Sequence, residues 1–545
     1  MVRPASGAER HGWQALATWW HGTTHGGAMS GRVMERGGYA AAATPAFGTR
    51  STYAALALLT LAALGLKLYR IDAASYWADE LFSVFWVRES LGFLWSAQAF
   101  EIETTPPLYY TLLKPWAAAF GSSELAIRSF SALLSAATIP LVWRLAREFT
   151  GPGTALLAAA IFALNPMQMQ FAQEARAYAL MPPLYVLALL GLMRFCRAAP
   201  ARRDGALALY GVAALGLVYA HATSAFTLAA LNICAGLWLL RARAGSAFAW
   251  APLLRLAVVD AVVVVLAIPE IRAILAQAGR YDIAWIEKPD LIGLFNLANT
   301  LLVDPIFALR FRIASIVSVA VLALFALVLW RARPGRLAWV FLATPAALFL
   351  AMTLGMSLAA SPFFIPRIAI FVPVPFAILA AMALASARPP AWLRGGFALA
   401  LVVATALGLH GILTVTPQIK ENWRGLAAVL GPQLGARDVV AIGPRTNMLG
   451  LGYYLDGLKQ DRWQPDGAPL IPLAPFAPQG MTEAERVPDA RIADWVRQGK
   501  RVWLVLNPRD GELLTQRAMG LVPGQAPRLD RRQAMLTVLV WDAAP

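Results

Sequence analysis

Apolar runs of about 20 residues recur between Ser51 and Thr416 and are separated by short polar turns. A helix needs about 20 apolar residues to cross the hydrocarbon core of a bilayer, so this pattern predicts membrane-spanning helices. The runs lie near 53–69, 105–120, 126–143, 153–171, 177–195, 206–219, 222–240, 253–270, 313–330, 337–357, 366–386 and 395–416. The sequence therefore predicts an α-helical polytopic membrane protein.

The arginines in the turns predict the orientation of these segments, because cytoplasmic loops carry an excess of Lys and Arg. Twelve spans would scatter the arginine clusters over both faces. Eleven spans place the clusters on one face, if 105–120 is a re-entrant or surface helix. These clusters lie near 144–147, 194–203, 241–255, 331–336 and 388–394. We therefore predict about eleven spans, with the amino terminus inside and the carboxy-terminal region outside.

The remaining segments complete the predicted domain organisation. Residues 1–50, rich in Gly, Ala, Arg and His, predict a disordered cytoplasmic tail. The predicted transmembrane catalytic domain is 51–416, with outer loops at about 70–125 and 271–312. Residues 417–545 are more polar and predict a small extracytoplasmic α/β domain. Its predicted elements are strands at Asp438–Ile442, Val502–Leu506 and Leu536–Trp541, and helices at about 486–498 and 511–519.

The composition restricts the class of protein further. With 59% apolar and 14% charged residues, the chain cannot be an ordinary soluble enzyme. The net charge of +16 does not indicate nucleic-acid binding, because the arginines sit in turns between apolar runs. Two cysteines, Cys196 and Cys234, provide no disulfide framework.

Acidic side chains cluster in the largely apolar first outer loop. Asp79-Glu80 follows the first span, and Glu103 precedes the pair Pro106-Pro107. A carboxylate in such a segment has a raised proton affinity and can serve as a general base, so we predict catalytic roles for Asp79, Glu80 and Glu103. The alternatives are a solvated loop acid and a helix cap. Asp79 and Glu103 are also candidate ligands of a divalent cation.

The segment from Gln173 to Tyr178 lies at the outer junction of two predicted spans. On a helix, Glu174 and Tyr178 share one face, and Gln173 and Arg176 share another. Arginine can neutralise a lipid phosphate bidentately, so we predict that this segment binds the donor phosphate or the acceptor. The alternative is a structural contact between Glu174 and Arg176.

Two isolated residues lie on the same predicted face. His221 ends a predicted helix, and Arg367 lies at the outer end of a span with no acid nearby in sequence. We predict that both contribute to the same donor or acceptor site. The alternatives are a structural histidine and an arginine that reaches the membrane interface. Ionisable groups at membrane depth are costly, so their convergence on one face indicates a functional site.

Several ordered motifs resemble those of the GT-C glycosyltransferases. These are WADE after the first span, then ETTPPLYY, QEARAY, Pro366-Arg367 and KENWRG (Lys420–Gly425). The type is similar to family 39, which includes protein O-mannosyltransferases, aminoarabinose transferases of lipid A and lipopolysaccharide-core sugar transferases. The resemblance covers about residues 51–425. The chain has Glu103-Thr104-Thr105-Pro106-Pro107 where the family often has Asp-x-His-Pro-Pro, and Ile368 where a tyrosine commonly follows the arginine.

The resemblance implies a polyprenyl-phosphate sugar donor and an extracytoplasmic active site in the bacterial plasma (inner) membrane. We expect an inverting transfer to a glycan, lipid or protein hydroxyl, with Asp79 as the base. Glu103 would stabilise an oxocarbenium-like state, and Arg176, Arg367 or a divalent cation would balance the leaving phosphate. The main alternative is a transporter or flippase of lipid-linked sugars, which would show repeated halves. A lipid-linked oligosaccharide ligase and an inactive scaffold are further alternatives.

Overall fold

The structure is a computed structural model of the whole chain. It describes residues 49–197, 203–241, 250–277, 286–305, 309–415, 420–435, 438–443, 448–456, 489–506, 522, 524–533 and 536–542. The predicted tail, apart from its last two residues, and the predicted helix at 511–519 lie outside these ranges. Residues 278–285 and 306–308 of the second predicted outer loop also lie outside them.

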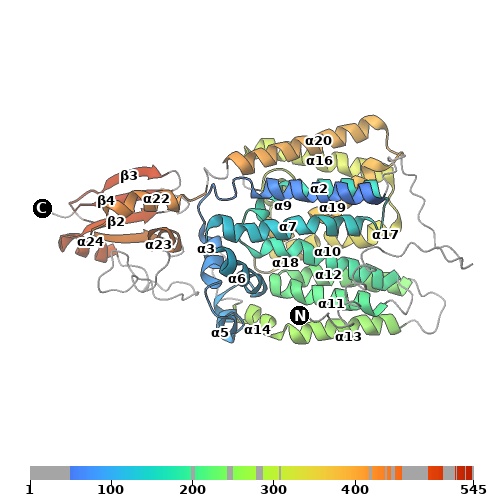
Figure 1. Cartoon of the computed structure of the whole chain (residues 1–545), viewed down its shortest axis with the longest axis horizontal. Helices are drawn as coiled ribbons and strands as arrows, with labels where there is room; N and C mark the ends of the chain where they lie inside the picture. The colour runs from blue at the N-terminus through green and yellow to red at the C-terminus, as the bar shows by residue number, and fades with distance from the viewer. Residues whose placement is uncertain are drawn as a thin grey trace, which may run out of the picture. The chain divides into compact units, whose positions relative to one another are not determined.

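Each of the eleven predicted spans coincides with a helix or with two helices joined at a bend (Figure 1). They are α2 (Thr49–Leu68), α7 (Glu124–Ala146), α8 (Pro152–Ala163) with α9 (Pro166–Ala172), α10 (Met181–Arg197), α11 (Arg203–Ala220), α12 (Ser224–Arg241), α13 (Ala251–Leu266) with α14 (Ile268–Gln277), α16 (Phe311–Ala332), α18 (Thr344–Ala359), α19 (Pro373–Ala385) and α20 (Ala391–His410). Within the described ranges, seven helices are long and apolar enough to cross a membrane, or nine if each bent pair is one span. The polytopic helical fold is confirmed. Two of the predicted spans, α11 and α19, are not among these nine candidates.

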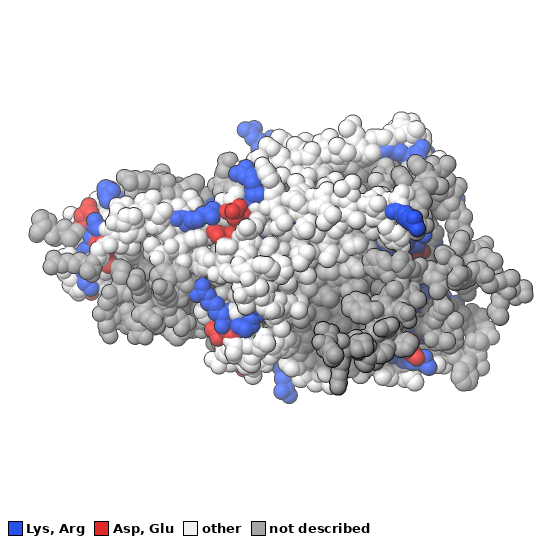
Figure 2. All heavy atoms as spheres, in the orientation of Figure 1, with Lys and Arg blue, Asp and Glu red and all other residues white. Residues whose placement is uncertain are grey.

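The surface of the helical region has the polarity of a membrane protein. On the face drawn in Figure 2, the described atoms along the middle of the helices are almost all uncharged, and the charged side chains lie toward the helix ends. Exposed apolar side chains such as Leu58, Leu61, Val402 and Trp392 come from α2 and α20. Such a band buries its apolar surface in lipid rather than in protein.

The first predicted outer loop folds into four short helices between α2 and α7. They are α3 (Ala78–Trp86), α4 (Leu91–Leu94), α5 (Ala97–Ile102) and α6 (Leu108–Phe120). With 13 residues, α6 is roughly 20 Å long, which is shorter than the hydrocarbon core. Within the described residues, α6 is not among the helices that are long and apolar enough to cross a membrane.

A bend of 58° separates α8 from α9. Pro166 occupies the first turn of α9, and Asn165 caps that helix by accepting a hydrogen bond from the Gln168 amide at 3.1 Å. The buried Lys67 donates to the Ala163 carbonyl at 3.4 Å, at the end of α8. Each helix end at the bend therefore has a side-chain partner.

Replacement of Gly408 by alanine is expected to destabilise this region by about 1–3 kcal/mol, the usual cost of overpacking. A Cβ at Gly408 would overlap the Pro166 ring and the Val303 carbonyl oxygen, because α20 passes directly over the bend. Gly396→Ala on the same helix is the matched control, since a Cβ there meets nothing within 4 Å. Unfolding midpoints of the two variants in detergent test this prediction, which equal midpoints would contradict.

The carboxy-terminal region contains a four-stranded sheet in the order β1-β2-β4-β3. The strands are β1 (Asp438–Gly443), β2 (Arg501–Leu506), β3 (Arg528–Gln533) and β4 (Leu536–Trp541), and the helices are α22 (Trp423–Leu430), α23 (Met448–Asp456) and α24 (Asp489–Arg497). Strand β1 runs parallel to β2, and the other pairs are antiparallel. One core cluster joins the sheet to α24, and another joins it to α22 and α23. The predicted α/β fold is confirmed.

Candidate active site

Glu80 is fully buried and holds the first loop together. Its carboxylate accepts two hydrogen bonds from Arg128, at 2.7 and 2.6 Å, and a third from the Ala175 amide at 3.0 Å. Burial opposes ionisation, but Arg128 and Lys420 hold the pKa of Glu80 below its usual value. Its oxygens are occupied and its side chain is shielded from solvent, which favours a structural role for Glu80. The catalytic role expected from the sequence stays a prediction.

Arg128 extends this contact to the backbone before α3. Its guanidinium donates to the carbonyls of Ile71 and Ala74 at 2.8 Å and to that of Ser75 at 3.0 Å. One buried arginine therefore fixes the polar turn that leads into α3.

Asp79, the neighbour of Glu80, points elsewhere and contacts Arg367. The Arg367 guanidinium donates to the Asp79 carboxylate at 3.2 Å, and both side chains are about a quarter exposed. Arg176 donates to the backbone carbonyl of Asp79 at 3.1 Å. Three residues predicted from separate motifs therefore meet, although they lie as far as 288 positions apart.

Arg176 also joins this group to the end of the first loop. It donates to the Thr105 hydroxyl at 2.9 Å and to the Tyr110 hydroxyl at 3.4 Å. Glu103 accepts from the Thr105 amide at 2.8 Å, and burial raises the pKa of Glu103 although Arg176 opposes the shift. Glu103 therefore holds Thr105, and Thr105 in turn accepts a hydrogen bond from Arg176. Glu103 also caps the turn before α6.

Tyr178 and His221 form an aromatic wall beside Arg367. The Arg367 guanidinium lies 5.5 Å from the centre of the Tyr178 ring, within cation–π range. The Tyr178 and His221 ring centres are also 5.5 Å apart. Burial, followed by the charges of Arg176 and Arg367, lowers the pKa of His221 to about 3. His221 is therefore neutral at physiological pH.

His221 is expected to make folding less favourable in acid. Its folded-state pKa of about 3 lies below the ordinary 6.5, so the unfolded chain binds more protons between these values and stability falls as pH drops through that window. His221→Gln should flatten this dependence, whereas His410→Gln, at an exposed site, should leave it unchanged. Unfolding midpoints from pH 3 to 7 measure the effect, and parallel curves for wild type and H221Q would contradict it.

Gln173 and Glu174 have hydrogen-bond partners other than those of Asp79. Gln173 donates to the carbonyls of Lys67 and Tyr69, both at 3.0 Å. Glu174 is buried and accepts from Gln170 at 2.6 Å and from Lys420 at 3.2 Å. Neither residue contacts Asp79 in the structure, and the predicted Glu174–Arg176 side-chain contact is not among the described hydrogen bonds.

Three buried N–H donors around Asp79 have no hydrogen-bond partner among the described residues. They are Trp77 Nε1, Arg176 Nε and Arg367 Nε. Buried donors are rarely left unpaired, and such groups call for a ligand or water. Their chemistry matches an anion with several acceptor oxygens, such as a phosphate.

The donor set fits a phosphate better than a metal ion. In the part of the chain that the structure describes, no three His, Cys, Asp or Glu side chains come together as a metal site requires. Asp79 faces the guanidinium of Arg367, and Glu103 faces Thr105. The residues present do not fit the divalent cation expected at Asp79 and Glu103.

Sequence reasoning missed Lys420, Thr105 and Tyr110 as members of this region. Lys420 lies 5.6 Å from the centre of the ring of Trp77, which is two residues before Asp79. Lys420 belongs to KENWRG and Tyr110 to ETTPPLYY, so the motifs themselves were the available signal.

Comparison with known proteins defines the class of this fold. Residues 104–268 match the family model described as dolichyl-phosphate-mannose-protein mannosyltransferase. ArnT from Cupriavidus metallidurans in the apo state is similar with a TM-score of 0.57 and 14% identity, over 90% of this chain and 98% of that one. ArnT bound to undecaprenyl phosphate gives a TM-score of 0.54 and 13% identity, over the same shares of the two chains. No curated protein matches the chain by sequence.

The fold is that of the GT-C glycosyltransferases, and the resemblance expected from the motifs is confirmed. Within that class, residues 104–268 are similar to the protein mannosyltransferase family.

Proposed function

We propose that the protein is a membrane glycosyltransferase that moves a sugar from a polyprenyl-phosphate donor to a glycan, lipid or protein hydroxyl. It acts in the bacterial plasma (inner) membrane, with its active site and carboxy-terminal domain on the extracytoplasmic face. The proposal rests on one observation: a candidate base, Asp79, contacts two candidate phosphate-binding groups, Arg176 and Arg367. The undecaprenyl phosphate bound to ArnT, a protein of the same fold, supports the class of donor.

The reaction is an inverting displacement. The acceptor oxygen attacks the anomeric carbon while Asp79 takes its proton, and the bond from that carbon to the phosphate oxygen breaks. The electron pair leaves with the polyprenyl phosphate, whose charge Arg176 and Arg367 balance. Glu103 positions Arg176 through Thr105, and the Tyr178 ring supports Arg367 from one side.

The Asp79–Arg367 ion pair links donor binding to the contacts of the base. A phosphate offers Arg367 a stronger, bidentate partner, so donor binding releases Asp79 from Arg367. The Asp79 carboxylate is then available to contact the acceptor hydroxyl.

The test is a transfer assay with purified protein and a labelled polyprenyl-phosphate sugar. A transferase releases polyprenyl phosphate and labels the acceptor, whereas a flippase moves the intact donor across a vesicle membrane. Movement of the donor without cleavage would overturn the proposal.

Arg367→Gln is expected to raise the Kd for undecaprenyl phosphate about tenfold, because a charge-assisted hydrogen bond is lost. Arg367→Lys should show a smaller increase, since lysine keeps the charge but not the bidentate geometry. Arg310→Gln removes an exposed arginine outside the site and is the control. Binding measured by native mass spectrometry checks this prediction, and equal affinities for R367Q and R310Q would contradict it.

A further inference from the structure

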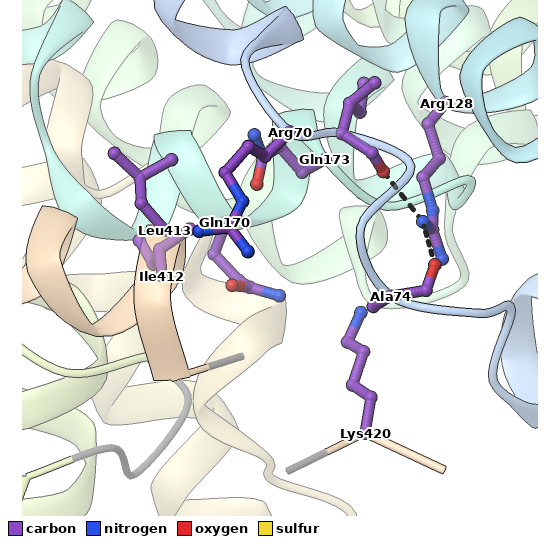
Figure 3. A pocket seen from close by; sticks show the side chains of 9 residues that line it. Arg70, Ala74, Arg128, Gln170, Gln173, Ile412, Leu413 and Lys420 are labelled. Atoms are coloured by element: carbon purple, nitrogen blue, oxygen red, sulfur yellow. Dashed lines mark hydrogen bonds between the residues drawn. The ribbon is translucent and has the colours of Figure 1, made fainter. Parts of the chain in front are cut away.

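A second polar hollow lies apart from Asp79, between the ends of α2, α9 and α20 (Figure 3). It is lined by Arg70, Arg128, Gln170 and Lys420 on its polar side and by Ile412 and Leu413 on its apolar side. None of Asp79, Arg176 and Arg367 lines it. The hollow is therefore distinct from the contacts of Asp79, although Lys420 borders both regions. Of the residues expected from the sequence, only Gln173 lines it.

The lining carries positive charge and no carboxylate. Arg128 is neutralised by Glu80, and Lys420 is paired with Glu174. Arg70 makes no side-chain hydrogen bond or ion pair to any residue within the described ranges, and its backbone has the left-handed conformation (φ 54°) that few residues other than glycine adopt. One guanidinium at the rim therefore lacks a counter-charge, which favours an anionic ligand.

Gln170 adds a second requirement for the ligand. Its side chain is 2% exposed, and its Oε1 has no partner among the described residues. Its Nε2 donates to the Glu174 carboxylate at 2.6 Å. A carboxylate is an acceptor, and the nitrogen is the only donor of the glutamine side chain, so the orientation of the amide is fixed. The unpaired Oε1 therefore needs a hydrogen-bond donor, such as a hydroxyl group.

The position of the hollow favours a lipid over a soluble anion. Ile412 and Leu413 follow α20, and Arg70 follows α2. Both helices expose large apolar side chains along their length, including Leu58, Leu61, Leu399 and Val402. A lipid whose chains pack on these helices would bring its headgroup to the helix ends.

We propose that this hollow, between Arg70, Gln170 and Lys420, binds the phosphate of an anionic membrane lipid whose headgroup also carries a hydroxyl. Arg70 and Lys420 contact the phosphate, Gln170 Oε1 accepts from the hydroxyl, and Ile412 and Leu413 contact the first part of the acyl chains. The binding does not depend on the transfer reaction.

The test measures binding of single lipids to the purified full chain in detergent by native mass spectrometry, without sugar donor. Phosphatidylglycerol and phosphatidylmethanol carry the same phosphodiester charge, but only the first has headgroup hydroxyls. Phosphatidylglycerol should bind about tenfold tighter, the value of one hydrogen bond to a buried acceptor. Equal affinities would overturn the assignment of Gln170.

Variants separate the two parts of the site. Arg70→Gln should weaken binding of both lipids about tenfold, whereas Arg310→Gln, a loss of the same charge elsewhere, should leave both affinities unchanged. Gln170→Leu should abolish the preference for phosphatidylglycerol and keep the affinity for phosphatidylmethanol. Unfolding midpoints identify any variant that has lost its fold. The comparison of the two lipids on the wild-type protein then still tests the assignment of Gln170.

A soluble competitor identifies the source of the phosphate. Glycerol 3-phosphate should displace phosphatidylglycerol only at concentrations more than about a hundredfold higher, because it lacks the apolar contacts. Displacement at equal concentration would overturn the lipid assignment. Equal loss of binding in R70Q and R310Q would overturn the site itself.

Discussion

Asp79→Asn is expected to lower kcat for sugar transfer by about 10²–10⁴-fold, the usual contribution of a general base. Asparagine has nearly the same shape but cannot take the acceptor proton. The same change frees Arg367 from its 3.2 Å ion pair, so the Kd for undecaprenyl phosphate should fall or stay constant. Loss of turnover without loss of donor binding distinguishes a base from a phosphate-binding residue.

The control is Glu101→Gln, which removes an exposed carboxylate from the same segment between α2 and α7. It should keep kcat within about twofold of wild type, as surface substitutions usually do. Single-turnover rates and donor affinities of the two variants test whether Asp79 is the base. Unchanged transfer by D79N would remove Asp79 from the mechanism.

Glu80→Gln is expected to destabilise the protein by about 3–5 kcal/mol, because it leaves the buried Arg128 without its counter-charge. Glu80 is fully buried and Arg128 is 1% exposed, so water cannot replace the lost partner. The measurement is the unfolding midpoint in detergent, together with kcat per folded molecule. If Glu80 is structural, E80Q should lower the unfolding midpoint and leave kcat per folded molecule unchanged.

The double variant Glu80→Met with Arg128→Met sharpens this test. Replacing both members of a buried pair with apolar residues removes the uncompensated charge, but it also removes the Arg128 hydrogen bonds to the carbonyls of Ile71, Ala74 and Ser75. Its unfolding midpoint therefore compares the cost of these lost hydrogen bonds with the cost of the unpaired charge in E80Q. A lower kcat in E80Q with unchanged stability would instead support the catalytic role that the sequence predicts for Glu80.

Periodicity and charge predicted the parts of the fold that depend on local physics. The spans follow from the length of apolar runs, and β1, β2 and β4 follow from short apolar segments between polar ones. β3 (Arg528–Gln533) was missed because its sequence, RLDRRQ, is polar. It pairs only with β4 at the edge of the sheet, where charged residues are ordinary.

The different roles of Asp79 and Glu80 could not be predicted from the dipeptide. Successive residues on a helix point about 100° apart, so only one of the two faces the inside of the protein. Which one does so depends on Arg128, 48 positions away. The arginine clusters in the turns predicted that Asp79, Arg176 and Arg367 lie on one face of the membrane, but their contacts depend on helix packing that no local pattern specifies.

The polar turn before α3 depends on the far end of the chain. Ser75 donates to the Glu421 carbonyl, and the Tyr454 hydroxyl accepts from the Tyr76 amide at 2.7 Å. These partners lie 346 and 378 positions apart. A ribosome makes the turn early and its partners last, so the nascent protein passes most of its synthesis with this turn incomplete. Chains that terminate before Glu421 would therefore contain every predicted span but lack both of these partners of the turn.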